Sequence, residues 1–263
     1  MSLGKLVRLN RIFSHPSGNL CSVAIDHFPI YQIGMPAGLR QIGKTLDAIM
    51  AGAPDAITMH KGLAKSLWQP YAGKTPFILQ TSGVRPDDTA MVTYGDLDEA
   101  MKLGADAIAV VAFLRNASEA AYLKMVADAV RASEAYQIPV ICHTYPRDRE
   151  NNVIYHPEDI AWCVRCILEV GADIIKVPYC GDPLAHRQIV EDCPVTIVAA
   201  GGPKTSTMHD ALTVLREACD AGVRGGTVGR NIWGSENITG ALKAYKAVIH
   251  EGAGADEALQ LMA

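Results

Sequence analysis

Short apolar runs rich in β-branched residues alternate along this chain with segments whose apolar residues recur every three or four positions. The first pattern is typical of strands buried on both faces, and the second of helices that bury one side. Eight runs are predicted as strands: residues 20–26, 56–60, 76–80, 107–113, 139–143, the run around Lys176, 194–199 and 225–229. Helices are predicted over about residues 35–49, 96–103, 118–136, 157–170, 207–221 and 237–250.

The alternation of strands and helices indicates the α/β class with a parallel sheet. Eight such units favour a closed (β/α)8 TIM barrel over an open doubly wound sheet, and 263 residues fit one barrel domain spanning 1–263. No GxGxxG motif follows the first predicted strand, which disfavours dinucleotide binding.

Composition narrows the class of partner. A net charge of −4 and a pI near 6.1 give no support to nucleic-acid binding. The sequence has no apolar run long enough to span a bilayer and no signal-peptide pattern, so we expect a soluble, cytoplasmic protein with no membrane partner.

Seven scattered cysteines do not resemble the framework of a small secreted scaffold, so reduced thiols are expected. Cys163 and Cys166 form a CxxC, but they lie in a helical pattern without a second Cys or His pair nearby. We therefore predict ordinary helix packing for both, with no metal and no cofactor.

Polar residues gather where the predicted strands end. In a TIM barrel, chemistry is carried out at the carboxyl ends of the strands and in the loops that follow them. The candidates in these positions are Asp26, His27, His60, Lys61, Tyr145, Arg147, Lys176, Gly201, Gly202, Lys204, Gly229, Arg230 and Asn231.

Lys176 stands inside an otherwise apolar strand. Burial disfavours the ammonium form and lowers the lysine pKa, as an amine that attacks a carbonyl requires. The alternative is a lysine whose stem packs while its ammonium group reaches water. Tyr145 ends the neighbouring strand, where its hydroxyl could exchange protons beside Lys176, and Asp26 could hold a substrate hydroxyl. Structural roles for Tyr145 and Asp26, as a strand cap and a loop-ordering carboxylate, remain open.

Glycines after the seventh and eighth strands suggest a phosphate site. Glycine lets the backbone approach an anion closely, and barrel enzymes frequently bind phosphate at this pair of loops. Gly201, Gly202 and Lys204 form one half of the predicted site, and Gly229 and Arg230 form the other. A Gly-Gly pair taken alone is also an ordinary turn.

The remaining candidates are predicted to line the substrate pocket. They are His27, His60, Lys61 and Arg147. His27 could instead only bond the backbone at the end of its strand, as histidines in such positions often do.

Seven motifs resemble the archaeal-type class I fructose-bisphosphate aldolases and their relatives, a superfamily that includes deoxyribose-phosphate aldolase, aminodideoxyheptulosonate synthase and phosphonooxypentane-dione thiolase. The motifs are residues 8–13 (RLNRIF), 25–27 (IDH), 145–147 (YPR), 171–176 (GADIIK), 200–202 (AGG), 228–231 (VGRN) and 248–252 (VIHEG). The resemblance implies that Lys176 forms the Schiff base, Tyr145 acts as general acid and base, and Asp26 assists. It also implies phosphate binding by the last two loops and a homo-oligomer, since decamers are common in that family.

Three positions depart from the family pattern: Phe28, Thr144 and Asp148. We expect them at the pocket rim, where they would favour a substrate other than fructose bisphosphate. The sequence thus predicts a class I aldolase that cleaves a phosphorylated ketose into a small phosphorylated ketone, such as dihydroxyacetone phosphate, and an aldehyde. Thiolase or transaldolase chemistry on the same lysine, and a non-catalytic phosphosugar-binding barrel, are the alternatives; Tyr145 favours the aldolase.

Overall fold

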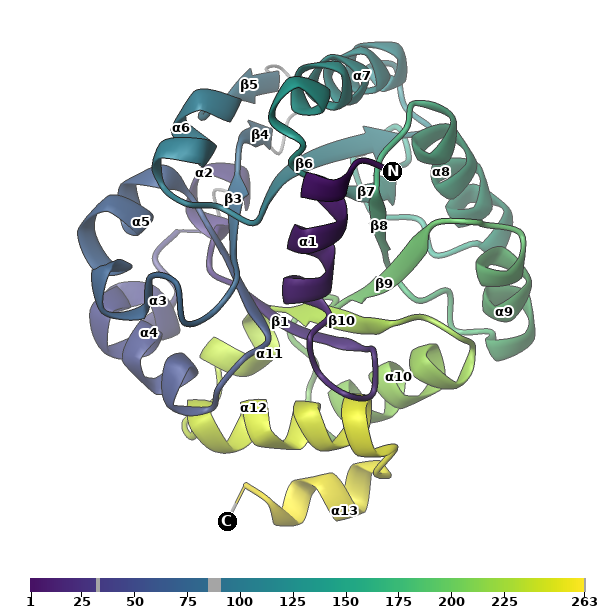
Figure 1. Ribbon diagram of the computed structural model, residues 1–263. Coiled ribbons are helices and arrows are strands. Elements are labelled where there is room, and N and C mark those ends of the chain that lie inside the picture. Colours follow the sequence, from purple (N-terminus) through teal and green to yellow (C-terminus); the bar gives the residue numbers. More distant parts are fainter. Residues whose placement is uncertain (32–33, 85–90, 263) are drawn as a thin grey trace.

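Eight parallel strands close into a barrel surrounded by helices (Figure 1). The computed structural model describes residues 1–31, 34–84 and 91–262. Around the barrel the strand order is β1-β10-β9-β8-β7-β6-β3-β2, which confirms the predicted TIM barrel. The strands are β1 (Leu20–Ala24), β2 (Ala56–Met59), β3 (Phe77–Gln80), β6 (Ala107–Leu114), β7 (Val140–Pro146), β8 (Ile174–Val177), β9 (Thr196–Ala200) and β10 (Gly225–Val228).

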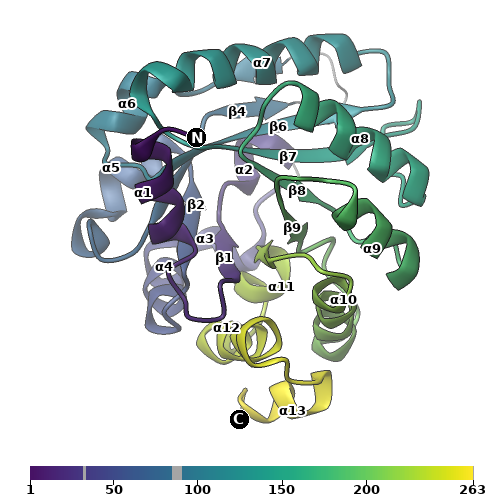
Figure 2. The same ribbon diagram turned by 45° about the vertical axis from the view of Figure 1, so that its right-hand side comes forward.

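Helices follow the strands and cover the outside of the barrel (Figures 1 and 2). They are α4 (Ile42–Ala51), α5 (Lys61–Leu67), α6 (Leu97–Lys102), α7 (Glu119–Tyr136), α8 (Pro157–Glu169), α9 (Pro183–Glu191), α10 (Met208–Asp220) and α12 (Ile238–Lys246). Shorter helical segments are α2 (His27–Tyr31), α3 (Ala37–Arg40), a 3-10 turn (Gln69–Tyr71), α11 (Arg230–Trp233), a π-helical turn (Ala247–Glu251) and α13 (Ala255–Gln260). No helix in the described ranges combines the length and hydropathy needed to cross a bilayer.

The single helix predicted over residues 35–49 is wrong. Two helices, α3 and α4, occupy this stretch, because Gln41 between them has φ −108° and ψ 64°, outside the helical region. A small hairpin, β4 (Ser82–Val84) with β5 (Met91–Thr93), was also not predicted, and each of its strands is only three residues long.

Side chains of the barrel strands alternate between two apolar layers. One set faces the surrounding helices, and the other fills the interior of the barrel near its amino end. The interior set forms a floor, made of Leu20, Ala56, Ile78, Ala107, Ala109, Ile141, Ile174 and Val198. Above this floor the inward-facing strand positions become polar, and the candidate site lies among these polar residues.

Helix α1 (Leu3–Ile12), which the sequence analysis did not identify, lies across the amino end of the barrel (Figure 1). Its Ile12 is fully buried and packs with the floor. Ion pairs hold the helix: Lys5 Nζ lies 2.6 Å from Glu134 Oε1 and 3.1 Å from Asp173 Oδ2, and Arg11 Nη1 lies 2.8 Å from Asp106 Oδ1. The amino end is therefore closed by structural contacts.

Candidate active site

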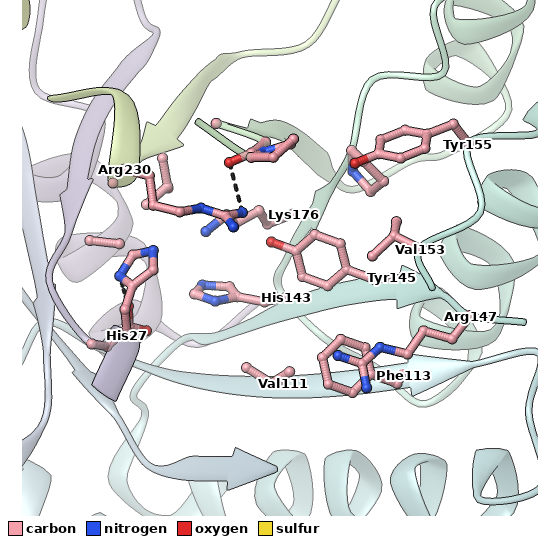
Figure 3. Close-up of a pocket in the computed structure, with 18 residues that line it drawn as sticks. His27, Val111, Phe113, His143, Tyr145, Arg147, Val153, Tyr155, Lys176 and Arg230 are labelled. Atoms are coloured by element: carbon pink, nitrogen blue, oxygen red, sulfur yellow. Dashed lines mark hydrogen bonds and ion pairs between the residues drawn. The ribbon is translucent and has the colours of Figure 1, made fainter. Parts of the chain in front are cut away.

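A pocket opens at the carboxyl ends of the barrel strands (Figure 3). Its lining comes from β1, β6, β7, β8 and β10, and from the loops that follow β1, β7, β8, β9 and β10. The lining residues are Ala24, Asp26, His27, Val111, Phe113, His143, Tyr145, Arg147, Val153, Tyr155, Lys176, Pro178, Gly201, Gly202, Pro203, Thr227, Gly229 and Arg230. Most of the residues predicted for catalysis and phosphate binding therefore meet in one cavity.

Lys176 extends from β8 into this pocket. Its neighbours Ile175 and Val177 face the helices, whereas Lys176 faces inward because strand side chains alternate. The residue is only 6% exposed. Burial lowers the pKa of Lys176 to about 8; the charge of Asp26 opposes this shift, and the charge of Arg230 adds to it. A neutral, nucleophilic amine is thus much more accessible near pH 7 than for a solvated lysine.

Tyr145 lies near the end of β7, and Arg147 is the first residue after the strand. Tyr145 packs against Phe113, with ring centroids 5.9 Å apart, and its hydroxyl points toward the centre of the pocket near Lys176 (Figure 3). The guanidinium carbon of Arg147 lies 3.2 Å from the centroid of the same Phe113 ring. Phe113 thus holds both polar side chains at one side of the cavity.

Asp26 and His27 lie on the opposite side of the pocket, just after β1. Asp26 Oδ1 lies 3.4 Å from His27 Nδ1, and both residues are buried. Burial lowers the pKa of His27 to about 4, although Asp26 alone would raise it. The His27 ring packs edge-on against Trp233, with centroids 5.2 Å apart. His27 is therefore a neutral wall of the pocket at neutral pH.

The two glycine loops are tied together beside the pocket. Arg230 Nη2 donates a hydrogen bond to Gly202 O at 2.8 Å, and Asn231 Nδ2 donates to Gly201 O at 3.0 Å. Gly202 has φ +66°, a backbone conformation that favours glycine. A Cβ atom on Gly229 would lie 2.4 Å from His27 Cε1, so a side chain there would force His27 to move. These contacts bring a guanidinium and side-chain-free backbone together, which suits an anion.

Three predicted site residues are bound elsewhere. His60 faces two backbone oxygens, Gln80 O and Asp26 O, each 3.1 Å from a ring nitrogen. Lys61 pairs with Glu99 at 2.9 Å, outside the residues that line the pocket. Lys204 donates to Gly234 O at 3.0 Å. Their side chains support neighbouring segments, so the structure does not bring them to the cavity.

The three positions expected at the pocket rim are not among its lining residues. Thr144 alternates with Tyr145 and is fully buried on the outer side of β7, near Cys163 of α8. Phe28 packs against the helix-facing core. The Asp148 carboxylate accepts hydrogen bonds from Glu150 N and Asn152 N, and thus shapes its own loop.

His143 is a pocket residue that the sequence analysis missed. It lies two positions before Tyr145 on β7 and pairs in register with Lys176 on β8. The two-residue period of a strand could have revealed it, because residues 143 and 145 must share a face. Tyr155, which lies beyond the end of β7, gave no comparable signal.

The CxxC is part of α8, as predicted. Cys163 is fully buried, and burial raises its thiol pKa to about 12, so the thiol is protonated and unreactive at neutral pH. Within the described residues, no cluster of three His, Cys, Asp or Glu side chains could hold a metal ion.

The fold and the pocket define a TIM-barrel enzyme with a buried amine facing a polar cavity. A family model described as DeoC/LacD family aldolase matches residues 20–235, so this chain belongs to that family of aldolases. It is an enzyme of the class I aldolase type, a carbon–carbon lyase.

Similar proteins include an uncharacterized aldolase of Saccharolobus solfataricus, 28% identical over 99% of both chains. A class 1 fructose-bisphosphate aldolase of Halobacterium salinarum is 31% identical, and the match covers 89% of this chain and 90% of that protein. Among solved structures, an archaeal fructose-1,6-bisphosphate aldolase with its catalytic lysine bound to the carbinolamine intermediate gives a TM-score of 0.81 at 25% identity. That match covers 94% of this chain and 99% of the other.

Proposed function

We propose that this protein reversibly cleaves a phosphorylated ketose through a Schiff base on Lys176, releasing a small phosphorylated ketone and an aldehyde. The observation that carries the proposal is the buried Lys176 amine, whose pKa is lowered to about 8, inside the same pocket as Tyr145 and the two glycine loops. The structure of a relative with its catalytic lysine bound to a carbinolamine supports this use of a lysine.

The proposed reaction begins when the neutral Lys176 amine attacks the ketone carbon. The resulting carbinolamine loses water to give a protonated imine, which withdraws electrons from the neighbouring carbon–carbon bond. Tyr145 accepts the proton of the substrate hydroxyl as that bond breaks and later returns a proton to the enamine. Asp26, across the pocket, accepts a hydrogen bond from a substrate hydroxyl. Hydrolysis of the imine then frees Lys176.

Phosphate recognition is assigned to the loops after β9 and β10. Arg230 supplies a positive charge beside Gly201, Gly202 and Gly229, where no side chain obstructs the backbone. Arg147 stands on the other side of the cavity, over Phe113, and would contact the aldehyde end of the substrate. The relatives named as fructose-bisphosphate aldolases support a sugar phosphate as the substrate class.

The range of ketoses stays open in this proposal. Phe28, Thr144 and Asp148, which led us to expect a substrate other than fructose bisphosphate, do not line the pocket. Their departure from the family pattern therefore does not exclude fructose bisphosphate, and the proposal covers ketose 1-phosphates in general.

Borohydride trapping tests the proposal directly. The protein is incubated with a panel of ketose 1-phosphates, fructose bisphosphate and dihydroxyacetone phosphate, then reduced and analysed by peptide mass spectrometry. We expect a stable adduct on Lys176 with at least one sugar phosphate, and aldehyde release from the same compound without borohydride. A panel that gives neither an adduct nor cleavage would refute the assignment.

A further inference from the structure

His143 lies immediately beside Lys176 in the barrel wall. The two residues are Cα partners on β7 and β8, and both side chains point into the pocket (Figure 3). Since neighbouring strands lie about 4.8 Å apart, a group bonded to the Lys176 amine comes within reach of the imidazole. Val111 of β6, the other partner of His143, is apolar and offers no hydrogen bond from its side chain.

The imidazole of His143 is buried yet not used by the fold. The residue is 4% exposed and lines the pocket, and within residues 1–31, 34–84 and 91–262 its ring makes no hydrogen bond to another protein group. His60, by contrast, faces two backbone carbonyls, and His27 lies beside Asp26. Because His143 lines the pocket and its ring has no protein partner in the described residues, its ring nitrogens are open to hydrogen bonds with a ligand there.

Its surroundings keep His143 neutral. Burial holds the pKa of His143 well below 6.5, and an ammonium charge on Lys176 lowers it further. A neutral imidazole has one N–H donor and one acceptor nitrogen. It can therefore donate a hydrogen bond to a carbonyl oxygen without adding a positive charge that would oppose the iminium ion forming on Lys176.

We propose that His143 is a further catalytic residue, which donates its ring N–H to the carbonyl oxygen of the substrate while Lys176 attacks the adjacent carbon. The inference rests on the proposed Schiff-base function. In this step the carbon–nitrogen bond forms and the π electron pair moves to oxygen, where the negative charge is met by the His143 N–H. Tyr145 then passes a proton from the new ammonium nitrogen to this oxygen, which becomes the carbinolamine hydroxyl. His143 therefore neither gains nor loses a proton.

The test compares His143→Gln, which keeps an N–H donor, with His143→Leu, which removes it. We expect His143→Leu to slow single-turnover adduct formation on Lys176 by about 100- to 1,000-fold, as for the loss of one donor to a developing oxyanion, with substrate KM changed much less. His143→Gln should stay within about tenfold of the wild type. Equal rates for the wild type and the leucine variant, or equal slowing in both variants, would overturn the proposal.

His186→Leu is the matched control. His186 is also fully buried and has no hydrogen-bond partner for either ring nitrogen in the described chain, but it packs against Tyr179 away from the pocket. We expect this variant to react at the wild-type rate. If it slows as much as His143→Leu, loss of a buried imidazole alone explains the effect and the catalytic role is refuted.

A measurement on the unaltered protein keeps the proposal testable if the variants fold poorly. Nitrogen-15 shifts of the His143 ring should show the neutral form at pH 7, and the signal of the donating nitrogen should change when dihydroxyacetone phosphate is added. An imidazolium signal at pH 7 would overturn the proposal. Wild-type protein without a Lys176 adduct would instead refute the Schiff-base function itself, which separates the two failures.

Discussion

Two lysines are buried at opposite ends of the same barrel, and their environments differ completely. Lys5 of α1 is 4% exposed beneath the apolar floor, and Lys176 is 6% exposed in the pocket above it. Lys5 Nζ lies 2.6 Å from Glu134 Oε1 and 3.1 Å from Asp173 Oδ2. Lys176 has no carboxylate within ion-pair distance among the described residues.

The difference in partners reverses the pKa shift. Burial lowers the pKa of Lys5, but the hydrogen bonds and charges of Glu134 and Asp173 outweigh it and raise the pKa overall. For Lys176 burial dominates, because Asp26 compensates only in part and Arg230 adds repulsion. Burial alone therefore does not make a lysine nucleophilic; what matters is that no close carboxylate stabilises the ammonium.

The largest expected effect comes from replacing each lysine by methionine. These two variants separate the catalytic role of Lys176 from the structural role of Lys5. Lys176→Met removes the nucleophile, and we expect kcat/KM for cleavage to fall by at least about 10,000-fold, with no borohydride adduct. Lys5→Met should keep activity within about twofold, because its ion pairs lie below the floor. Initial rates measure kcat/KM for both variants. Comparable losses of kcat/KM would show that the contrast between the two ends of the barrel is wrong.

The pH dependence of adduct formation should follow Lys176 rather than Lys5. Only the neutral amine attacks, so the rate at subsaturating substrate should rise about tenfold per pH unit below pH 8 and level off above it. Lys5→Met should give the same curve. A rate still rising steeply above pH 9.5 would mean that the lysine pKa is not lowered.

Arg230→Met should weaken phosphate binding and also change the amine. Loss of a charge-assisted hydrogen bond is expected to raise KM for a phosphorylated ketose by about 10- to 100-fold. Because Arg230 lowers the pKa of Lys176, the pH curve should also move toward higher pH. Arg11→Met, which removes an arginine paired with Asp106 at the closed end, is the control and should leave both quantities unchanged. An unchanged KM in Arg230→Met would place the phosphate elsewhere.

Stability should depend on pH in opposite ways for the two lysines. Lys5 has a raised pKa, so its stabilisation of the folded state is fully present below pH 10.5 and is lost only as pH rises beyond the folded-state pKa. Lys176 has a lowered pKa, so its ammonium destabilises the folded state below about pH 8, and this penalty fades as pH approaches 10.5.

Urea unfolding at pH 7 and pH 9.5 measures this contrast. Lys5→Met should be less stable than the wild type by a similar amount at both pH values. Lys176→Met should be more stable than the wild type at pH 7, and the difference should shrink at pH 9.5. A stabilisation by Lys176→Met that grows with pH would contradict the assigned pKa direction.

The amino-acid sequence determined the barrel and the place of its chemistry. Hydrophobic periodicity is a local property, so the eight strands could be located within a few residues of their ends. A lysine in the sixth strand, and polar or glycine residues at strand ends, then indicated the pocket, because all carboxyl ends of a parallel barrel meet on one face. The same periodicity would also have placed His143 beside Tyr145 on the inner face.

Only the tertiary structure decided which of these side chains reach the pocket. The sequence shows that Lys61 and Lys204 follow strands, but not that Glu99 and the Gly234 carbonyl hold them outside the pocket. It does not pair His143 with Lys176, since register depends on how separate strands pack. Nor does it distinguish Lys5 from Lys176 by charge environment, because Glu134 and Asp173 reach Lys5 from more than 120 positions away in the chain. Desolvation and ion pairing depend on distances in space, and these exist only once the barrel has closed.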